Sequence, residues 1–69
     1  MPLVQVNMRE GRTPEQIRAL ITSVTDAVVD STGAPKDTVS VMVNEVPGTH
    51  WASNDVTLDE KRAGRQPRP

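Results

Sequence analysis

One helix with clear start and stop signals lies between two valine-rich runs, and this order limits what the chain can fold into. Thr13 can cap the helix, Pro14 suits its first position, and Gln16 can complete a capping box with Thr13. Gly33 and Pro35 end the helix. The apolar residues between these signals have helical spacing and form one stripe: Ile17, Leu20, Ile21, Val24, Ala27 and Val28. The sequence therefore predicts one amphipathic helix with a single face to bury.

The segments on either side of this helix are typical of β-strands. Residues 2–8 and residues 39–46 are rich in valine, and a glycine-containing break follows each of them. A strand, a helix and a strand in this order form a β-α-β unit with parallel strands and a right-handed crossover. Residues 49–60 suggest a short hairpin or an extended arm around Ser53-Asn54-Asp55. We therefore expect an α/β (α+β) fold, in which a β-α-β subunit is followed by a short C-terminal hairpin.

The size of the chain indicates that it needs a partner. At 69 residues it is one small domain, and a domain of this size buries only about 60% of the surface that its unfolded chain exposes. It has no cysteine and only one aromatic residue, Trp51. A single helix also leaves one face of a parallel sheet open, whereas such sheets are normally covered on both faces. We expect other copies of the chain to complete the sheet by oligomerisation.

Charge divides the chain near residue 60. Residues 1–60 form the single domain and carry four basic and nine acidic side chains, a net charge of −5 that argues against nucleic-acid binding. Residues 61–69 are basic and nearly without apolar side chains, so we expect a disordered tail there. We find neither a signal peptide nor an apolar stretch long enough to cross a membrane, and we expect a cytoplasmic protein.

Pro2 is the residue that most directly suggests chemistry. Methionine is normally removed before a small residue such as proline, and its removal would leave Pro2 with a free secondary amine at the start of the chain. An α-amino group titrates at roughly 7.7–8.0, and burial or neighbouring cations lower the pKa of an amine. The nitrogen would then be a usable base. Many proteins begin with Met-Pro for no chemical reason, so this feature alone is a weak signal.

Several features together resemble the 4-oxalocrotonate tautomerase family over roughly residues 2–51. The most specific of them are Pro2 and, at the right distance from it, the run Glu-Gly-Arg-Thr-Pro-Glu-Gln at residues 10–16. The resemblance implies dimers whose sheets join, commonly assembled as trimers of dimers, and hence a homohexamer. It also implies an isomerase that needs neither a metal nor an organic cofactor. The amino-terminal proline would be the general base in keto-enol or dienol isomerisation of a 2-hydroxydienoate, an enolpyruvate or a related α-keto acid.

The resemblance also assigns substrate-binding roles. Arg12 matches the family arginine that holds a substrate carboxylate, and Trp51 stands where the family places an aromatic wall of the pocket. Ser40 replaces a second arginine of the best-known members, and its hydroxyl offers a hydrogen bond but no charge. A substrate with one carboxylate is therefore expected over one with two. Arg9 could supply the missing cation. Plainer interpretations are a solvated cation for either arginine and an oligomer contact for Trp51.

Strand geometry separates these residues. If residues 2–9 form one strand, which rises about 3.3 Å per residue, Pro2 and Arg9 lie roughly 23 Å apart. Arg12 follows three residues later and cannot easily return to Pro2 of its own chain. A site that joins Pro2 with Arg12 should therefore combine two chains, and assembly would be a condition of activity.

Two other functions remain open. Arg9 with Arg12 resembles one subunit of the trans-3-chloroacrylic acid dehalogenases, so hydration, dehalogenation or decarboxylation is an alternative reaction. Those enzymes need a water-activating glutamate, and Ser53 stands in its place. The other alternative is a non-catalytic subunit that partners a related chain in a hetero-oligomer, as the serine at position 40 would allow.

Overall fold

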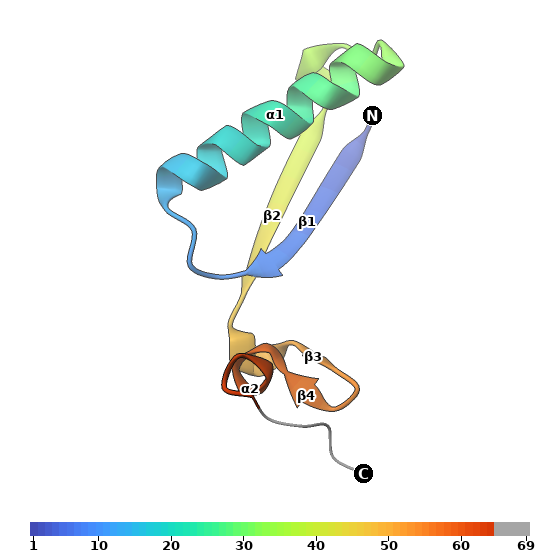
Figure 1. Cartoon of the computed structure of the whole chain (residues 1–69). Coiled ribbons are helices and arrows are strands. Elements are labelled where there is room, and N and C mark those ends of the chain that lie inside the picture. The colour runs from blue at the N-terminus through green and yellow to red at the C-terminus, as the bar shows by residue number, and fades with distance from the viewer. Residues whose placement is uncertain (65–69) are drawn as a thin grey trace.

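The computed structural model describes residues 1–64 and confirms the expected fold class. Figure 1 shows the β-α-β unit with a separate hairpin and a short helix beyond it. The strands and helices are, in chain order, β1 (Leu3–Arg9), α1 (Pro14–Thr32), β2 (Ser40–Val46), β3 (Ala52–Ser53), β4 (Val56–Thr57) and α2 (Leu58–Arg62). Short 3₁₀ helices at Lys36–Thr38 and Gly48–His50 precede β2 and β3.

Helix α1 begins and ends at the residues that the sequence indicates. Thr13 Oγ1 accepts a hydrogen bond from the Gln16 N–H at 3.1 Å, and Gln16 Oε1 accepts one from the Thr13 N–H at 2.9 Å. At the other end Gly33 has φ 73° and donates its N–H to the carbonyl of Val29. A left-handed residue at this position favours glycine, so the helix ends here. These caps set the two ends of α1.

Strands β1 and β2 pair in parallel, as expected, in a register that runs from Leu3 opposite Ser40 to Arg9 opposite Val46. Helix α1 packs mainly against β2 on one face of this two-stranded sheet (Figure 1). The other face stays open in the single chain: Leu3 is 56% and Met42 47% exposed. In the single chain, water therefore contacts large apolar side chains on the open face of the sheet.

A tight hairpin and α2 follow β2 at the end of the sheet where β1 also ends (Figure 1). Asn54 and Asp55 connect β3 to β4 with φ 53° and 60°, the left-handed backbone of a two-residue hairpin turn. Thr57 and Glu60 form a second capping box, which starts α2. Lys61 and Arg62, which we assigned to the tail, belong to α2, whereas residues 65–69 lie outside the described residues.

The single chain has almost no core of its own. Among residues 1–64, Val56 is the only hydrophobic residue that is buried, at 8% exposure. Hydrophobic burial is the dominant favourable contribution to folding, so a chain with so little of it depends on further contacts. No helix in this part of the chain is long and apolar enough to cross a membrane. The open face of the sheet is the natural place for another chain to pack.

Candidate active site

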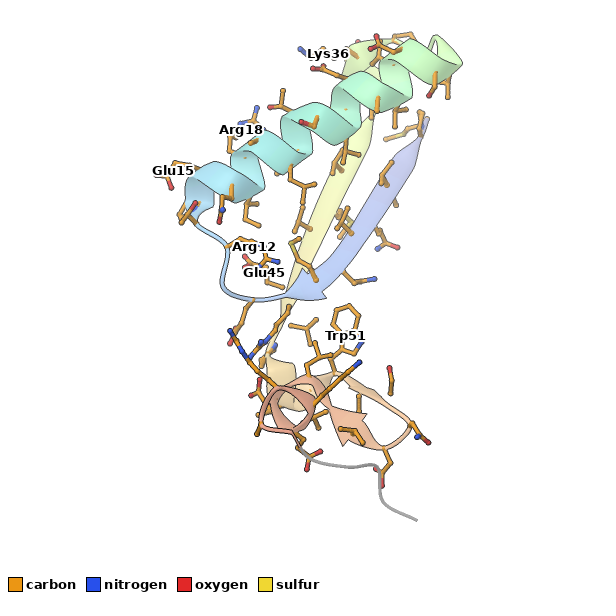
Figure 2. All side chains as sticks on the ribbon, viewed as in Figure 1. Arg12, Glu15, Arg18, Lys36, Glu45 and Trp51 are labelled. Atoms are coloured by element: carbon orange, nitrogen blue, oxygen red, sulfur yellow. The ribbon has the colours of Figure 1, made fainter. Side chains whose placement is uncertain are left out.

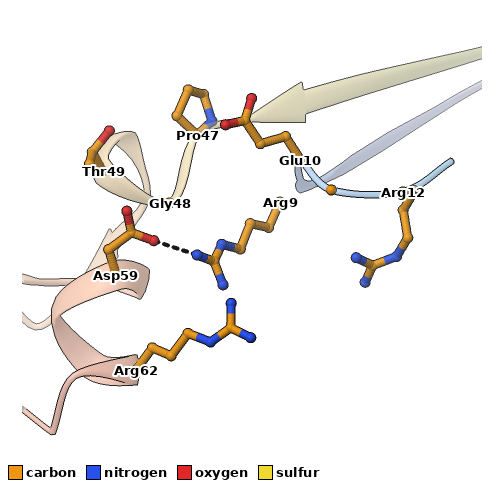
Figure 3. Close-up of a pocket in the computed structure, with 9 residues that line it drawn as sticks. Arg9, Glu10, Arg12, Pro47, Gly48, Thr49, Asp59 and Arg62 are labelled. Carbon is orange, nitrogen blue, oxygen red and sulfur yellow. Dashed lines mark hydrogen bonds and ion pairs between the residues drawn. The ribbon is translucent and has the colours of Figure 1, made fainter.

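A pocket of about 710 Å³ lies where β1 and β2 end, and we call it the arginine pocket. Three segments far apart in the sequence line it (Figure 3). The first is the end of β1 with the loop after it, the second is the turn after β2, and the third is α2. The lining residues are Arg9, Glu10, Gly11, Arg12, Pro47, Gly48, Thr49, Asp59 and Arg62. Two of the predicted site residues, Arg9 and Arg12, are thus brought together.

An ion pair between Arg9 and Asp59 joins the sheet to α2. The Arg9 Nη2 lies 2.5 Å from Asp59 Oδ1, although the two residues are 50 positions apart in the chain. Their side chains are 33% and 42% exposed, so water still reaches the pair. Asp59 lies in the first turn of α2, where a helix favours negative charge. The guanidinium of Arg9 is therefore already engaged before any ligand arrives.

Gly48 makes this close approach possible. It is buried, and a Cβ at this position would overlap the Asp59 carboxylate and lie 2.8 Å from Arg9 Nε. Contacts this short do not occur between real Cβ atoms and their neighbours. The turn after β2 therefore needs a residue without a side chain if Arg9 and Asp59 are to meet beside it.

Arg12 and Arg62 flank the Arg9–Asp59 pair. Figure 3 shows Arg62 extending from α2 toward the guanidinium of Arg9, with Arg12 on the other side of the pocket. Within residues 1–64, neither arginine forms an ion pair with a carboxylate. Three cationic and two anionic side chains line the pocket, so its formal charge is +1. Adjacent like charges attract an anion, and guanidinium groups are well suited to a carboxylate.

Pro2 and Ser40 lie at the opposite end of the sheet from this pocket. Ser40 donates its N–H to the Pro2 carbonyl at 2.9 Å, and neither residue lines the pocket. The seven residues of β1 separate the two ends, which corresponds to about 23 Å from Pro2 to Arg9. One chain by itself therefore does not bring Pro2 to Arg12.

Trp51 lies between the sheet and the hairpin. Figure 2 shows its ring directed from the hairpin toward the ends of β1 and β2. Trp51 is partly buried, and its carbonyl accepts the Leu58 N–H at 2.9 Å. Its place is thus set by the junction between the hairpin and α2. It does not belong to the residues that line the arginine pocket in this chain.

Asp59 and Arg62 are two charged pocket residues that the sequence analysis does not predict. We assigned Arg62 to a disordered tail and gave Asp59 no role. The signal that could have found them is the run Thr57-Leu58-Asp59-Glu60, because a threonine followed three residues later by glutamate often starts a helix. No group of three metal-ligating side chains comes together within residues 1–64.

Comparisons with known proteins identify the family. A family model described as "Tautomerase enzyme" matches residues 2–61. A probable tautomerase of Ralstonia nicotianae is 46% identical over 67 residues, which cover 97% of this chain and 91% of that protein. The 2-hydroxymuconate tautomerase of Pseudomonas putida is 43% identical over 60 residues, which cover 87% of this chain and 95% of that protein.

Two solved structures have the same fold. TomN, a 4-oxalocrotonate tautomerase homologue of the tomaymycin biosynthetic pathway, aligns with a TM-score of 0.87 and 35% identity over 90% of this chain and 95% of its own. The heterohexamer 4-oxalocrotonate tautomerase of Chloroflexus aurantiacus aligns with a TM-score of 0.82 and 32% identity over 87% of this chain and 97% of its own. The chain belongs to the 4-oxalocrotonate tautomerase family and is an isomerase, as the sequence predicts.

Proposed function

We propose that this chain is a tautomerase that uses no cofactor, with Pro2 as the general base once Met1 has been removed. Its substrate would be a 2-hydroxydienoate, an enolpyruvate or a related α-keto acid. Family membership and the 2-hydroxymuconate tautomerase among the relatives support a tautomerase. The arginine pocket is the observation that supports binding of a substrate carboxylate. Arg12 lines this pocket and has no carboxylate partner among the described residues.

The proposed reaction moves one proton. The neutral nitrogen of Pro2 takes a proton from an enol or from the carbon next to a carbonyl, and it returns a proton to a different atom of the conjugated system. A positioned base of this kind contributes about 10²- to 10⁴-fold in rate. Arg12 would hold the substrate carboxylate in a bidentate pair and so fix which carbon faces the nitrogen. Trp51 would supply apolar surface near the reacting atoms.

Two chains would build each active site. The arginine pocket of one chain would receive Pro2 and Ser40 from a neighbour, because these residues lie at opposite ends of the sheet in one chain. A trimer of dimers with six equivalent sites is the assembly that we propose. The open sheet face, with Leu3 and Met42 exposed, supports such close packing of copies. Activity would then require assembly.

The test is ketonisation of phenylenolpyruvate by the wild type and by the Pro2→Ala variant, after intact mass has established that Met1 is absent from both. We expect the variant to lose about 10²-fold or more in kcat/KM. Pro35→Ala is the matched control, because Pro35 lies beyond α1 and outside the arginine pocket. Equal activity of the wild type and Pro2→Ala would refute the role of Pro2 as base.

A reaction that adds water is the second candidate, because Arg9 and Arg12 line one pocket as that reaction would need. Ser53 lies in β3 of the hairpin and supplies no carboxylate. Glu10 and Asp59 are the carboxylates that line the pocket, and Asp59 pairs with Arg9. Halide release from trans-3-chloroacrylate would identify this activity. Its absence in a protein that ketonises phenylenolpyruvate would exclude it.

A subunit of a hetero-oligomer is the third candidate, and the heterohexameric relative from Chloroflexus aurantiacus gives it a precedent in the family. Ser40, in place of a second arginine, is the feature of this chain that such a role would explain. The mass of the purified protein in solution is the decisive measurement. An active assembly made of this chain alone would rule the hetero-oligomer out, whereas an inactive monomer would favour it.

A further inference from the structure

The charges in the arginine pocket are unequally available to a ligand. Arg9 ends β1, Arg12 lies in the loop after it, and Arg62 reaches in from α2 (Figure 3). Asp59 lies one turn before Arg62 on the same helix. Its Oδ1 forms an ion pair with the Nη2 of Arg9 at 2.5 Å. Arg12 and Arg62 are left without a carboxylate partner among residues 1–64. An incoming anion therefore meets two available guanidinium groups and one that is already neutralised.

We propose that Asp59 is a charge filter, which by pairing with Arg9 limits this pocket to substrates with a single carboxylate, held between Arg12 and Arg62. The proposal deepens the proposed tautomerase function and rests on it. It assigns a substrate-binding role to Arg62 and a specificity role to Asp59. Both residues belong to α2, so this short helix becomes part of the binding site.

The formal charge of the pocket indicates which ligands it should prefer, those with one carboxylate or those with two. The pocket carries +1, so one carboxylate neutralises it, whereas a dicarboxylate leaves an excess negative charge close to Asp59. Arg9 could meet a second carboxylate only if Asp59 moved away. The ion pair keeps the two side chains together, and Gly48, which has no side chain, leaves room for their contact. Ser40 brings no further cation from the other end of the sheet. A second substrate carboxylate therefore has no available counter-charge.

Two unreactive ligands isolate the effect of charge. Sorbate and trans,trans-muconate share a conjugated six-carbon chain and differ in that muconate has a carboxylate at both ends. Their binding to the assembled protein, processed at Met1, can be measured by titration calorimetry at neutral pH. Since neither ligand needs to react, the measurement does not depend on proton transfer by Pro2. If Pro2→Ala keeps full ketonisation activity while the ligand preference is as expected, the tautomerase mechanism fails and the charge filter stands.

We expect the wild type to bind sorbate at least as tightly as muconate. In Asp59→Asn the pocket charge rises to +2 and Arg9 becomes available, so muconate should bind about tenfold more tightly relative to sorbate. In Arg62→Gln both ligands should bind about tenfold more weakly. Lys61→Gln removes the same charge from the neighbouring position of α2, which does not line the pocket, and should change neither affinity.

The double variant Arg9→Gln/Asp59→Asn separates charge from packing. It replaces an ion pair by a neutral pair of similar size, so the pocket charge stays at +1 and the wild-type preference should return. If Asp59 only holds α2 in place, the double variant should keep the ratio of muconate to sorbate affinity of Asp59→Asn. An unchanged ratio of muconate to sorbate affinity in Asp59→Asn would overturn the charge filter. Equal losses in Lys61→Gln and Arg62→Gln would overturn the role of Arg62.

Discussion

Ser40 donates its backbone N–H to the carbonyl oxygen of Pro2 at 2.9 Å, which extends the parallel pairing of β1 and β2 by one residue. Pro2 is therefore held at one end of the sheet, although it is next to the first residue of the chain. Arg9 and Arg12 lie at the other end, in the arginine pocket. This separation is the physical basis for a site shared between two chains.

Mixing two inactive variants tests the shared site. Pro2→Ala and Arg12→Ala should each lose activity, because one lacks the base and the other lacks the carboxylate partner. After the two proteins are unfolded together and reassembled, about a quarter of the sites should combine an intact Pro2 with an intact Arg12 from different chains. Ketonisation of phenylenolpyruvate should rise accordingly. A mixture no more active than its parents would mean that one chain supplies both residues.

The capping box at Thr13 should contribute to stability without touching the site. Thr13→Ala removes the hydrogen bond to the Gln16 N–H and should cost about 1 kcal/mol in the free energy of unfolding. Thr22→Ala is the control, because the Thr22 hydroxyl bonds only to the Arg18 carbonyl within the same helix. Denaturant titration of both variants measures the difference. Equal stability of the two would show that the box matters little here.

Local signals in the sequence predict most of the fold. The caps at Thr13 and Gly33, the valine-rich strands and the hairpin around Asn54-Asp55 are all present in the structure. Each of these features depends on residues only a few positions apart in the sequence. Over such short distances, the capping and turn residues and the spacing of hydrophobic residues determine the local structure. This explains why a chain with one aromatic residue could still be assigned to its fold class.

The arginine pocket was harder to predict, because its central contact joins residues 50 positions apart. The spacing of Arg9 and Asp59 in the sequence does not indicate that the two residues are in contact. Their contact depends on the course of the backbone from β2 through Gly48 to α2. Because residues 61–69 are basic in composition, the sequence analysis also places Arg62 in a tail and gives it no role in the site. Arg9 and Arg12 were found because they lie close together in the sequence, at the end of one strand.

A side chain at Gly48 should break the Arg9–Asp59 pair. In Gly48→Ala the new methyl group would overlap the Asp59 carboxylate, and relief of this overlap should cost about 1–3 kcal/mol in the free energy of unfolding. In an Asp59→Ala background the same substitution should cost clearly less, because the overlapping carboxylate is gone. Thermal or denaturant unfolding of the four proteins completes this cycle. Identical costs in both backgrounds would place the strain elsewhere.

The open face of the sheet should be where copies of the chain pack. Met42 lies there opposite Gln5 and is 47% exposed in the single chain, although it is a large apolar residue. Met42→Lys would place a charge in an interface from which water is excluded, and an unpaired charge there is strongly unfavourable. We expect the variant to sediment as a smaller species than the wild type and to lose ketonisation activity with assembly.

Thr22→Lys is the control for this variant, because it adds the same charge at an exposed position of α1. It should leave both the sedimentation coefficient and the activity unchanged. If Met42→Lys stays fully assembled, the open face is not an interface, and the large apolar side chains on it need another explanation. If it dissociates yet keeps its activity, each chain must contain a complete site, which the distance from Pro2 to the arginine pocket argues against.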